Sequence, residues 1–236
     1  MIELKNITVK YGTKTVVDDV SAEAKAGEFI ALVGPNGSGK SSLLKAISGL
    51  IPSSGSTSLP QQARARARSL SYLAQNSTAP DHRRVEDIIR LGRTPFLGAL
   101  AKMRETDTQA VQTAAAACEI DQFLDRKFGT LSGGEQMRVH LSRALATKAP
   151  ILLADEPTTA LDPYYQISVM NILQKESRTG TTIIAALHDL NLAQKFADRI
   201  WVMNKGKLVA EGPSNTALTD DILETVFRVT SNGDIV

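Results

Sequence analysis

The chain has 236 residues, of which 42% are hydrophobic and 22% charged, and its formal net charge at pH 7 is +2. This composition is typical of a folded globular protein, and so small a net charge gives no reason to expect nucleic acid as a partner. Cys118 is the only cysteine, which excludes an intrachain disulfide, and no run of about 18 apolar residues is present to cross a bilayer. We therefore expect a cytosolic chain that reaches a membrane only when another protein holds it there.

The N-terminal residues predict strands, then a glycine-rich turn and a helix. Residues 2–9 alternate apolar and polar side chains, as a half-buried strand does, and residues 16–20 can pair with them across a turn at Gly12. Residues 29–33 form a short apolar run that stops at glycines, which is typical of a buried parallel strand. Leucine and isoleucine recur at helical spacing over residues 43–50, so a helix is expected after that turn.

The next stretch is expected to leave regular structure and then to return to it. Residues 51–59 are rich in serine, glycine and proline and predict a loop. In the run that follows, Arg64, Arg66 and Arg68 alternate with alanines, which allows a two-faced strand with one basic face. That face could meet nucleic acid or could be a solvated sheet edge, and we favour the solvated edge.

The rest of the chain predicts helices followed by a second set of strands. From about residue 85 to residue 147 the pattern is helical, with alanine-rich stretches. Apolar strands return at residues 151–154, 182–187 and 200–203, and the last of them continues through a turn into a hairpin that ends at residues 208–210. The order of elements predicts an α/β fold with a helical insertion.

Residues 34–41 read Gly-Pro-Asn-Gly-Ser-Gly-Lys-Ser and fit the phosphate-loop pattern GxxxxGK[ST]. Glycines allow consecutive backbone N–H groups to turn toward phosphate oxygens, and the helix start that follows adds positive partial charge. Lys40 can reach the β and γ phosphates, and the Ser41 hydroxyl can bind Mg²⁺. A glycine turn without a ligand is the alternative, but the position between a predicted strand and a predicted helix favours nucleotide binding. The candidate nucleotide-binding residues of this loop are Gly34, Pro35, Asn36, Gly37, Ser38, Gly39, Lys40, Ser41 and Ser42.

A second motif has carboxylates at the end of a strand. The apolar run 151–154 is followed by Asp155 and Glu156, and at the carboxyl edge of a parallel sheet both side chains would face the phosphates. Asp155 would then hold Mg²⁺, directly or through water, and Glu156 would act as general base on the attacking water. Acidic strand ends are common, so this motif is informative only in combination with the phosphate loop.

The third motif, residues 131–135, reads Leu-Ser-Gly-Gly-Glu and starts a predicted helix. Ser132 followed by Glu135 is a capping box, so a well-made helix N-terminus is one interpretation. Gly133 and Gly134 reduce helix stability, however, and exposed N–H groups with a hydroxyl at a helix start form an anion site. We favour the anion site.

These motifs, in this order, resemble those of ABC transporter ATPases, and the resemblance covers nearly the whole chain. It identifies residues 34–41 as Walker A, residues 151–156 as Walker B, and residues 131–135 as the signature that binds the γ-phosphate held by a second subunit. It implies a P-loop NTPase (RecA-like) core with an antiparallel β subdomain and an inserted α-helical subdomain. The expected organisation is a single ABC ATPase domain over residues 1–236, with a nucleotide-binding α/β core in 1–76 and 149–236 and a helical signature subdomain in 77–148.

The resemblance also implies roles for residues outside these motifs. Gln75 resembles the Q-loop glutamine, which reports on Mg²⁺ and the attacking water, and His188 resembles the switch histidine at the γ-phosphate. Asp162 ends an Ala-Leu-Asp segment similar to the D-loop, and Tyr11 lies where the family places an aromatic residue against adenine. The implied catalytic set is Lys40, Glu156 and His188; the Mg²⁺ set is Ser41, Gln75 and Asp155; the nucleotide set adds Tyr11, Gln75, Ser132, Gly133, Gly134, Glu135 and Asp162 to the phosphate-loop residues.

The chain departs from the family pattern at a few positions. Met137 stands where glutamine is common, Ala74 stands where proline is common, and the stretch 53–70 is shorter than usual. None of these departures removes a catalytic group. The short stretch implies a trimmed β arm near the adenine side.

The resemblance implies ATP and Mg²⁺ as cofactors and a second copy of the chain as partner in a head-to-tail ATP sandwich. Further expected partners are a polytopic membrane permease and, indirectly, an extracytoplasmic substrate-binding protein, whereas nucleic acid is not expected. The chain would then be a peripheral protein at the cytoplasmic face of the inner membrane.

Residues 91–98 and 206–227 resemble the ferric siderophore, haem and cobalamin branch of bacterial ABC importers, although Phe96 replaces a histidine often found there. In that branch, Phe96 and its neighbours, including Arg93, are candidates for contact with the channel protein. One alternative is a soluble non-transport ABC ATPase that acts on a protein scaffold. Another is a different phosphate-loop enzyme, such as a small-molecule kinase, in which residues 131–135 would have no use.

Overall fold

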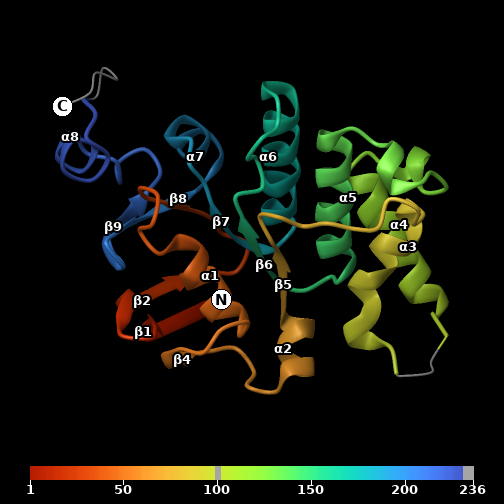
Figure 1. Cartoon of the computed structure of the whole chain (residues 1–236), viewed down its shortest axis with the longest axis horizontal. Helices are drawn as coiled ribbons and strands as arrows, with labels where there is room; N and C mark the ends of the chain where they lie inside the picture. Colours follow the sequence, from red (N-terminus) through yellow and green to blue (C-terminus); the bar gives the residue numbers. More distant parts are fainter. Residues whose placement is uncertain (99–101, 231–236) are drawn as a thin grey trace.

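The computed structural model describes residues 1–98 and 102–230 as a mixed α/β protein (Figure 1). Within this part of the chain, a six-stranded sheet has the strand order β5-β6-β7-β3-β8-β9, and a three-stranded sheet has the order β2-β1-β4. Figure 1 shows α3, α4 and α5 on one side of the molecule, with β1 and β2 on the opposite side. The predicted α/β fold with an antiparallel sheet and a helical insertion is confirmed.

The larger sheet is mostly parallel, and its interior strands are almost entirely apolar. Its strands are β3 (Phe29–Val33), β5 (Leu70–Leu73), β6 (Ile151–Asp155), β7 (Thr182–Ala186), β8 (Arg199–Asn204) and β9 (Lys207–Pro213). Every residue of β3, β6 and β7 is buried, because helices cover both faces of a parallel sheet. β9 pairs with β8 as an antiparallel hairpin at the edge. The predicted strands of this sheet and the hairpin are confirmed.

The smaller sheet consists of β1 (Ile2–Tyr11), β2 (Lys14–Ala24) and β4 (Ser54–Thr57), all antiparallel. The predicted pairing of the first two strands is confirmed. The prediction of a loop over residues 51–59 is wrong for β4, which pairs Thr57 with Leu4 and Ser54 with Thr8. The side chains of this short edge strand carry no apolar alternation, so only the backbone bonds to β1 make it a strand.

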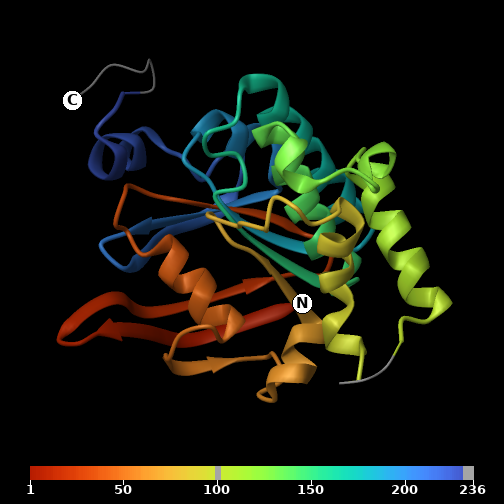
Figure 2. The same cartoon turned by 45° about the vertical axis from the view of Figure 1, so that its right-hand side comes forward.

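The helical region lies between β5 and β6 in sequence (Figure 2). It contains α3 (Val85–Arg90), the 3₁₀ helix η1 (Leu91–Phe96), α4 (Glu105–Ala117), the 3₁₀ turns η2 (Asp121–Phe123) and η3 (Phe128–Thr130), and α5 (Gly133–Ala146). The remaining helices are α1 (Lys40–Ser48), α2 (Ala63–Ser69), α6 (Pro163–Arg178), α7 (Leu190–Phe196), α8 (Asp220–Ile222) and the π-helical turn η4 (Leu223–Phe227). None of the helices in the described ranges has the length and apolar character needed to span a membrane.

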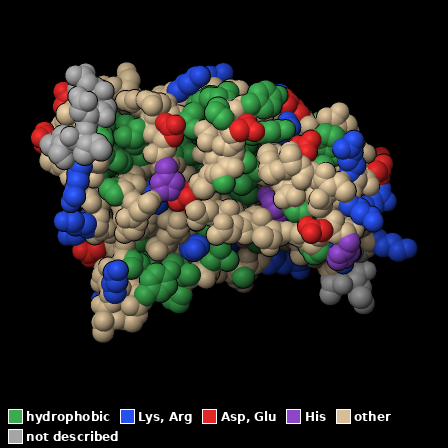
Figure 3. Space-filling model, turned by 45° about the horizontal axis from the view of Figure 1, so that its top comes forward, with side chains coloured by type: hydrophobic (Ala, Val, Ile, Leu, Met, Phe, Trp, Pro, Cys, Tyr) green, Lys and Arg blue, Asp and Glu red, His purple; other side chains and the backbone are tan. Residues whose placement is uncertain are grey.

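The arginine run forms the helix α2, so the two-faced strand expected there is wrong. Alanine and arginine are among the strongest helix formers, and alternation over so few residues does not separate a strand from a helix. Arg64, Arg66 and Arg68 each donate a hydrogen bond to a backbone carbonyl oxygen, so these guanidinium groups do not form the basic face of a strand. On the side of the molecule that Figure 3 shows, basic side chains are interspersed with acidic ones.

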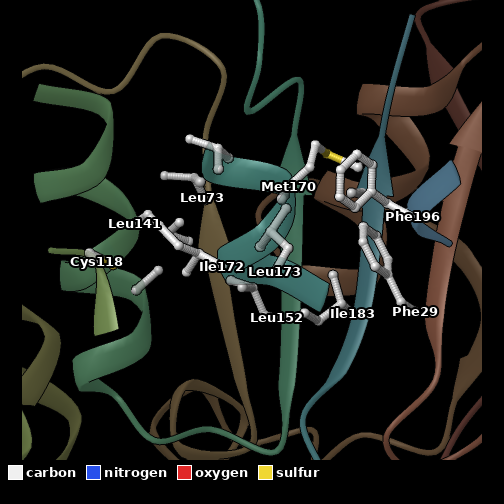
Figure 4. Close-up of a cluster of buried hydrophobic side chains, with 14 of the residues drawn as sticks. Phe29, Leu73, Cys118, Leu141, Leu152, Met170, Ile172, Leu173, Ile183 and Phe196 are labelled. Atoms are coloured by element: carbon white, nitrogen blue, oxygen red, sulfur yellow. The ribbon is translucent and has the colours of Figure 1, made fainter. Parts of the chain in front are cut away.

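Alternate side chains of the large sheet build two hydrophobic clusters. Ile30 and Leu32 share one cluster with α1 and the antiparallel sheet. Phe29 belongs to the other, together with Leu173 of α6 and Leu141 of α5 (Figure 4). The second cluster is therefore continuous from the sheet into the helical region, and it joins the two parts of the molecule.

Candidate functional site

The phosphate-loop motif connects β3 to α1, as predicted, and its backbone requires glycine. A Cβ atom on Gly34 would lie 2.1 Å from the Met203 carbonyl oxygen, and one on Gly39 would lie 2.5 Å from the Val16 carbonyl oxygen. Gly39 also has a φ of +105° and caps α1 without a side-chain hydrogen bond. The backbone N–H groups at the start of α1 are thus left available for an anion.

A cavity of about 500 Å³ lies beside this loop. It is lined by Lys14, Thr15, Val16, Asn36, Gly37, Ser38, Gly39, Lys40, Ser41, Ser42, Glu156, Lys205 and Gly206. Lys205 and Gly206 form the turn of the β8–β9 hairpin, and the Gly206 N–H donates to the Ser38 carbonyl oxygen at 2.9 Å. The sequence motifs predicted the loop and Glu156 but not the residues that β2 and this hairpin contribute.

Lys40 is buried in the loop, with Nζ donating to the carbonyl oxygens of Gly34 at 2.7 Å and Pro35 at 3.3 Å. Burial lowers the pKa of Lys40, while the nearby carboxylates of Glu156 and Asp155 act in the opposite direction. The ammonium group therefore lies at the phosphate loop with both acidic groups within electrostatic range.

Asp155 ends β6, is almost completely buried, and accepts hydrogen bonds from two hydroxyl groups. The Ser41 Oγ atom lies 2.7 Å from one carboxylate oxygen, and the Tyr72 hydroxyl lies 2.9 Å from the other. Burial raises the pKa of Tyr72, and the Asp155 carboxylate raises it further, so the hydroxyl stays protonated and donates. Sequence reasoning missed Tyr72, and its one available signal was its place in the strand that leads to Gln75.

Glu156 follows Asp155 in the left-handed region, with φ of +53°, and its carboxylate joins three segments. Gln75 Nε2 lies 2.5 Å from one carboxylate oxygen, and Thr159 Oγ1 donates to that oxygen at 3.1 Å. His188 Nε2 lies 2.5 Å from the other oxygen. The structure thus brings together Gln75, Glu156 and His188, three residues to which the family resemblance assigns roles around the γ-phosphate and the attacking water. Thr159 is a further contact that the resemblance did not predict.

A triphosphate with Mg²⁺ fits these residues. Among the described residues, Ser38 Oγ is buried without a hydrogen-bond partner, and Ser38 lines the cavity, so its hydroxyl can donate a hydrogen bond to a phosphate oxygen. The Ser41 hydroxyl and the Asp155 carboxylate, already in contact, are the oxygen ligands that Mg²⁺ prefers. Gln75, the third residue predicted for the metal, bonds to Glu156 instead of to either of these groups.

The residues of the third motif lie at the start of α5 and do not line this cavity. The predicted capping box is present, because the Glu135 carboxylate accepts from the Ser132 N–H at 2.7 Å and the Glu135 N–H donates to Ser132 Oγ at 3.4 Å. A Cβ on Gly134 would lie 2.3 Å from the Tyr165 ring, so packing requires this glycine, whereas Gly133 has open space. Packing therefore explains one glycine of the pair and leaves the other for a different role.

Two further predicted residues also lie outside the cavity lining. Asp162 caps α6 and accepts a hydrogen bond from the Tyr165 N–H at 3.1 Å. Tyr11 ends β1 with 52% of its surface exposed. A single copy of the chain thus assembles the phosphate loop with Gln75, Asp155, Glu156 and His188, but not with Tyr11, Asp162 or residues 132–135.

Known proteins are similar in sequence to this chain over almost its full length. The sequence profile described as ABC transporter matches residues 17–159. Hemin import ATP-binding protein HmuV of Streptomyces coelicolor is 38% identical over 94% of this chain and 81% of its own length. Ferric enterobactin transport ATP-binding protein FepC of Escherichia coli is 35% identical over 94% of this chain and 85% of its own length.

Solved structures agree with this similarity. A dimeric post-hydrolysis state of an ATP-binding cassette, with ADP and Pi bound, matches with a TM-score of 0.77 and 30% identity, over 91% of this chain and 99% of that one. An inward-facing ABC transporter of proposed metal-chelate type matches with a TM-score of 0.86 and 25% identity, over 97% of this chain and 89% of that one. The predicted P-loop NTPase fold is therefore confirmed, and the chain belongs to the ABC transporter family as one of its ATPases.

Proposed function

We propose that this chain is the ATP-hydrolysing subunit of an importer for a metal chelate of the haem, ferric-siderophore or cobalamin type. The observation that supports hydrolysis best is the contact of Gln75 and His188 with the carboxylate of Glu156 beside the phosphate loop. The haem and enterobactin relatives support the cargo class. In this proposal the chain works at the cytoplasmic face of the inner membrane, and the cargo itself never touches it.

Each polar group of the cavity has a part in the proposed reaction. Lys40 would bind the β and γ phosphates, and Ser41 and Asp155 would hold Mg²⁺, with Gln75, which bonds to Glu156 in this structure, as the third candidate for the metal. Bound Mg²⁺ would neutralise charge on the phosphate oxygens. Glu156 accepts a proton from the attacking water, while Gln75, His188 and Thr159 fix the direction of its carboxylate.

A second copy of the chain would complete the site. Ser132, Gly133, Gly134 and Glu135 present a hydroxyl and a helix start that do not line their own cavity. In a head-to-tail dimer they would meet the γ-phosphate held by the partner subunit, with Asp162 at the same interface and Tyr11 against adenine. The open space around Gly133 is consistent with close approach of a ligand there.

A groove on the helical region is our candidate for the membrane permease. It has a volume of about 310 Å³ and is lined by Thr78, Ala79, Pro80, Arg83, Asp87, Ile88, Leu91 and Arg143. Leu91 is exposed at its edge, whereas Arg93 is buried and Phe96 is half-buried. The expectation that Arg93 contacts the channel is therefore wrong, because its guanidinium is enclosed within the helical region. We also propose that residues 77–148 form the helical signature subdomain. An extracytoplasmic substrate-binding protein is a further, indirect partner in this proposal.

The test uses purified wild-type protein and the Glu156→Gln variant with ATP and Mg²⁺. The wild type should release phosphate, and the variant should bind ATP, form a dimer in light scattering and release phosphate at least about a hundredfold more slowly. Wild-type turnover in the variant would contradict the assignment of the base. Tagged variant recovered from detergent-solubilised native membranes should carry a polytopic membrane protein, whereas recovery of soluble partners alone would favour the scaffold-type ATPase.

A further inference from the structure

The arginines of α2 hold a segment that belongs to the helical region. Arg64 donates from Nε to the Pro95 carbonyl oxygen at 3.1 Å and from Nη2 to the Leu97 carbonyl oxygen at 2.7 Å. Arg68 donates from Nε to the Pro95 carbonyl oxygen at 2.9 Å. A fork of guanidinium donors on neighbouring carbonyls fixes both position and direction of the backbone it holds.

The same segment has further contacts through Phe96. The Phe96 ring is within cation–π distance of two guanidinium groups, with Arg93 at 4.0 Å and Arg68 at 5.3 Å from the ring centroid. Arg93 is buried, pairs with Asp107 of α4, and donates to the carbonyl oxygens of Ala146 and Thr147 at the end of α5. Residues 94–97 therefore form a junction between α2 and the helical region.

α2 is also connected along the chain, through β5 and Gln75, to the catalytic carboxylate. It ends at Ser69, β5 begins at Leu70, and Gln75 follows β5 and bonds to Glu156. A single short stretch, residues 63–75, thus carries the arginines at one end and the Q-loop glutamine at the other. Because β5 is paired with β6, this stretch has little freedom to bend between its ends.

Most residues of the groove proposed for the permease lie between these two contacts in sequence. They run from Thr78 to Leu91, with Gln75 before them and Pro95 after them. Figure 2 shows α2 beside the η1 segment, in agreement with the contacts between the two elements. A shift of residues 63–75 would act on the groove from both ends at once.

We propose that Arg64 and Arg68 are positioning residues that transmit a movement of Gln75, on nucleotide binding, to residues 91–97 at the edge of the groove. The inference rests on the proposed function only in that the groove receives the membrane partner. Arg66 of the same helix donates to the Pro60 carbonyl oxygen, and in the described part of the chain neither a hydrogen bond nor a cation–π contact joins its guanidinium to residues 91–97. It is therefore a matched control.

The experiment places an environment-sensitive fluorophore on Leu91→Cys in the Glu156→Gln chain. Native Cys118 is fully buried, and burial raises its pKa, so the label reacts at position 91. Addition of ATP and Mg²⁺ should change the fluorescence in this parent. The Arg64→Ala/Arg68→Ala change should reduce that amplitude about fivefold or more, with ATP half-saturation within about twofold and dimer formation retained.

Arg66→Ala should keep the full amplitude. The Arg64→Lys/Arg68→Lys change, which keeps charge and helix propensity, should give an intermediate amplitude, because one lysine cannot donate to both Pro95 and Leu97 in the fixed geometry of a guanidinium. A merely structural role would lower the melting temperature and leave the ATP-induced amplitude unchanged. Full amplitude in the double alanine variant, or no ATP-induced change in a parent that does form the dimer, would overturn the coupling alone. A parent that forms no dimer with ATP would contradict the proposed function and the coupling with it.

Discussion

Replacing Arg93 by methionine should lower the free energy of unfolding more than a change at a nearby surface residue does. The guanidinium of Arg93 lies 2.9 Å from the Asp107 carboxylate, and both residues are almost completely buried. Methionine has a similar apolar length, so it fills most of the space, but it leaves the carboxylate without its cation. It also removes the donors to the Ala146 and Thr147 carbonyl oxygens.

The magnitude follows from what remains bonded after the change. Loss of one partner of a buried ion pair costs about 3–5 kcal/mol. Asp107 keeps one partner, the Arg104 N–H at 3.0 Å, so the lower end applies and we expect about 3 kcal/mol. For a chain of this length, that loss lowers the melting temperature by roughly 6–12 °C.

The assay is urea unfolding followed by circular dichroism at pH 7, with thermal unfolding as a second measurement. Arg90→Met is the control, because Arg90 makes a half-exposed i,i+4 pair with Glu86 and its loss should cost only about 0.5 kcal/mol. A loss for Arg93→Met below about 1 kcal/mol, similar to the control, would refute the reasoning, since it would mean that water reaches Asp107 and replaces the guanidinium.

Three further predictions concern the site and its supports. Tyr72→Phe removes the hydroxyl that donates a hydrogen bond to Asp155. In a Mg²⁺ titration, the concentration for half-maximal phosphate release should therefore rise about fivefold with little change in the maximal rate. An unchanged half-maximal Mg²⁺ concentration would count against a role of this contact in metal binding. Gly134→Ala inserts a methyl group into the Tyr165 ring and should lower the free energy of unfolding by about 1–3 kcal/mol in urea, whereas an unchanged midpoint would show that the ring moves aside freely. Burial lowers the pKa of His140 to about 4. As the pH falls from about 6.5 to about 4, this histidine takes up a proton in the unfolded chain but stays neutral in the folded one, which favours the unfolded state. Over that window the free energy of unfolding of the wild type should fall relative to His140→Leu, and parallel pH profiles of the two proteins would contradict this.

The parts of the site that sequence predicted are those in which the same few residues both serve the chemistry and determine the local backbone structure. The phosphate loop needs its glycines because the backbone of Met203 and Val16 approaches Gly34 and Gly39, and the same glycines make the motif visible. Asp155 and Glu156 stand out because they end a fully apolar strand. For such residues a short stretch of sequence already contains the physical reason for the structure.

The features that sequence missed depend on neighbours that are distant in the chain. Tyr72 meets Asp155 only because β5 lies next to β6, which no local pattern of the tyrosine predicts. Arg93 was a candidate for contact with the channel protein, but it is buried and bonds to Asp107 of α4 and to the end of α5. The arginine run became a helix because alanine and arginine favour one, although its alternation also suited a strand.

The turn of the β8–β9 hairpin has a consequence for anyone who modifies this chain. Hairpin tips are usually the preferred places for epitope tags and inserted domains, because they are exposed and weakly held. Here the tip at Gly206 is fastened on both sides, since its N–H donates to the Ser38 carbonyl oxygen and its own carbonyl oxygen accepts from the Asp18 N–H at 2.8 Å. An insertion at Gly206 would therefore break two backbone hydrogen bonds beside the nucleotide cavity, so this tip is a poor point of attachment.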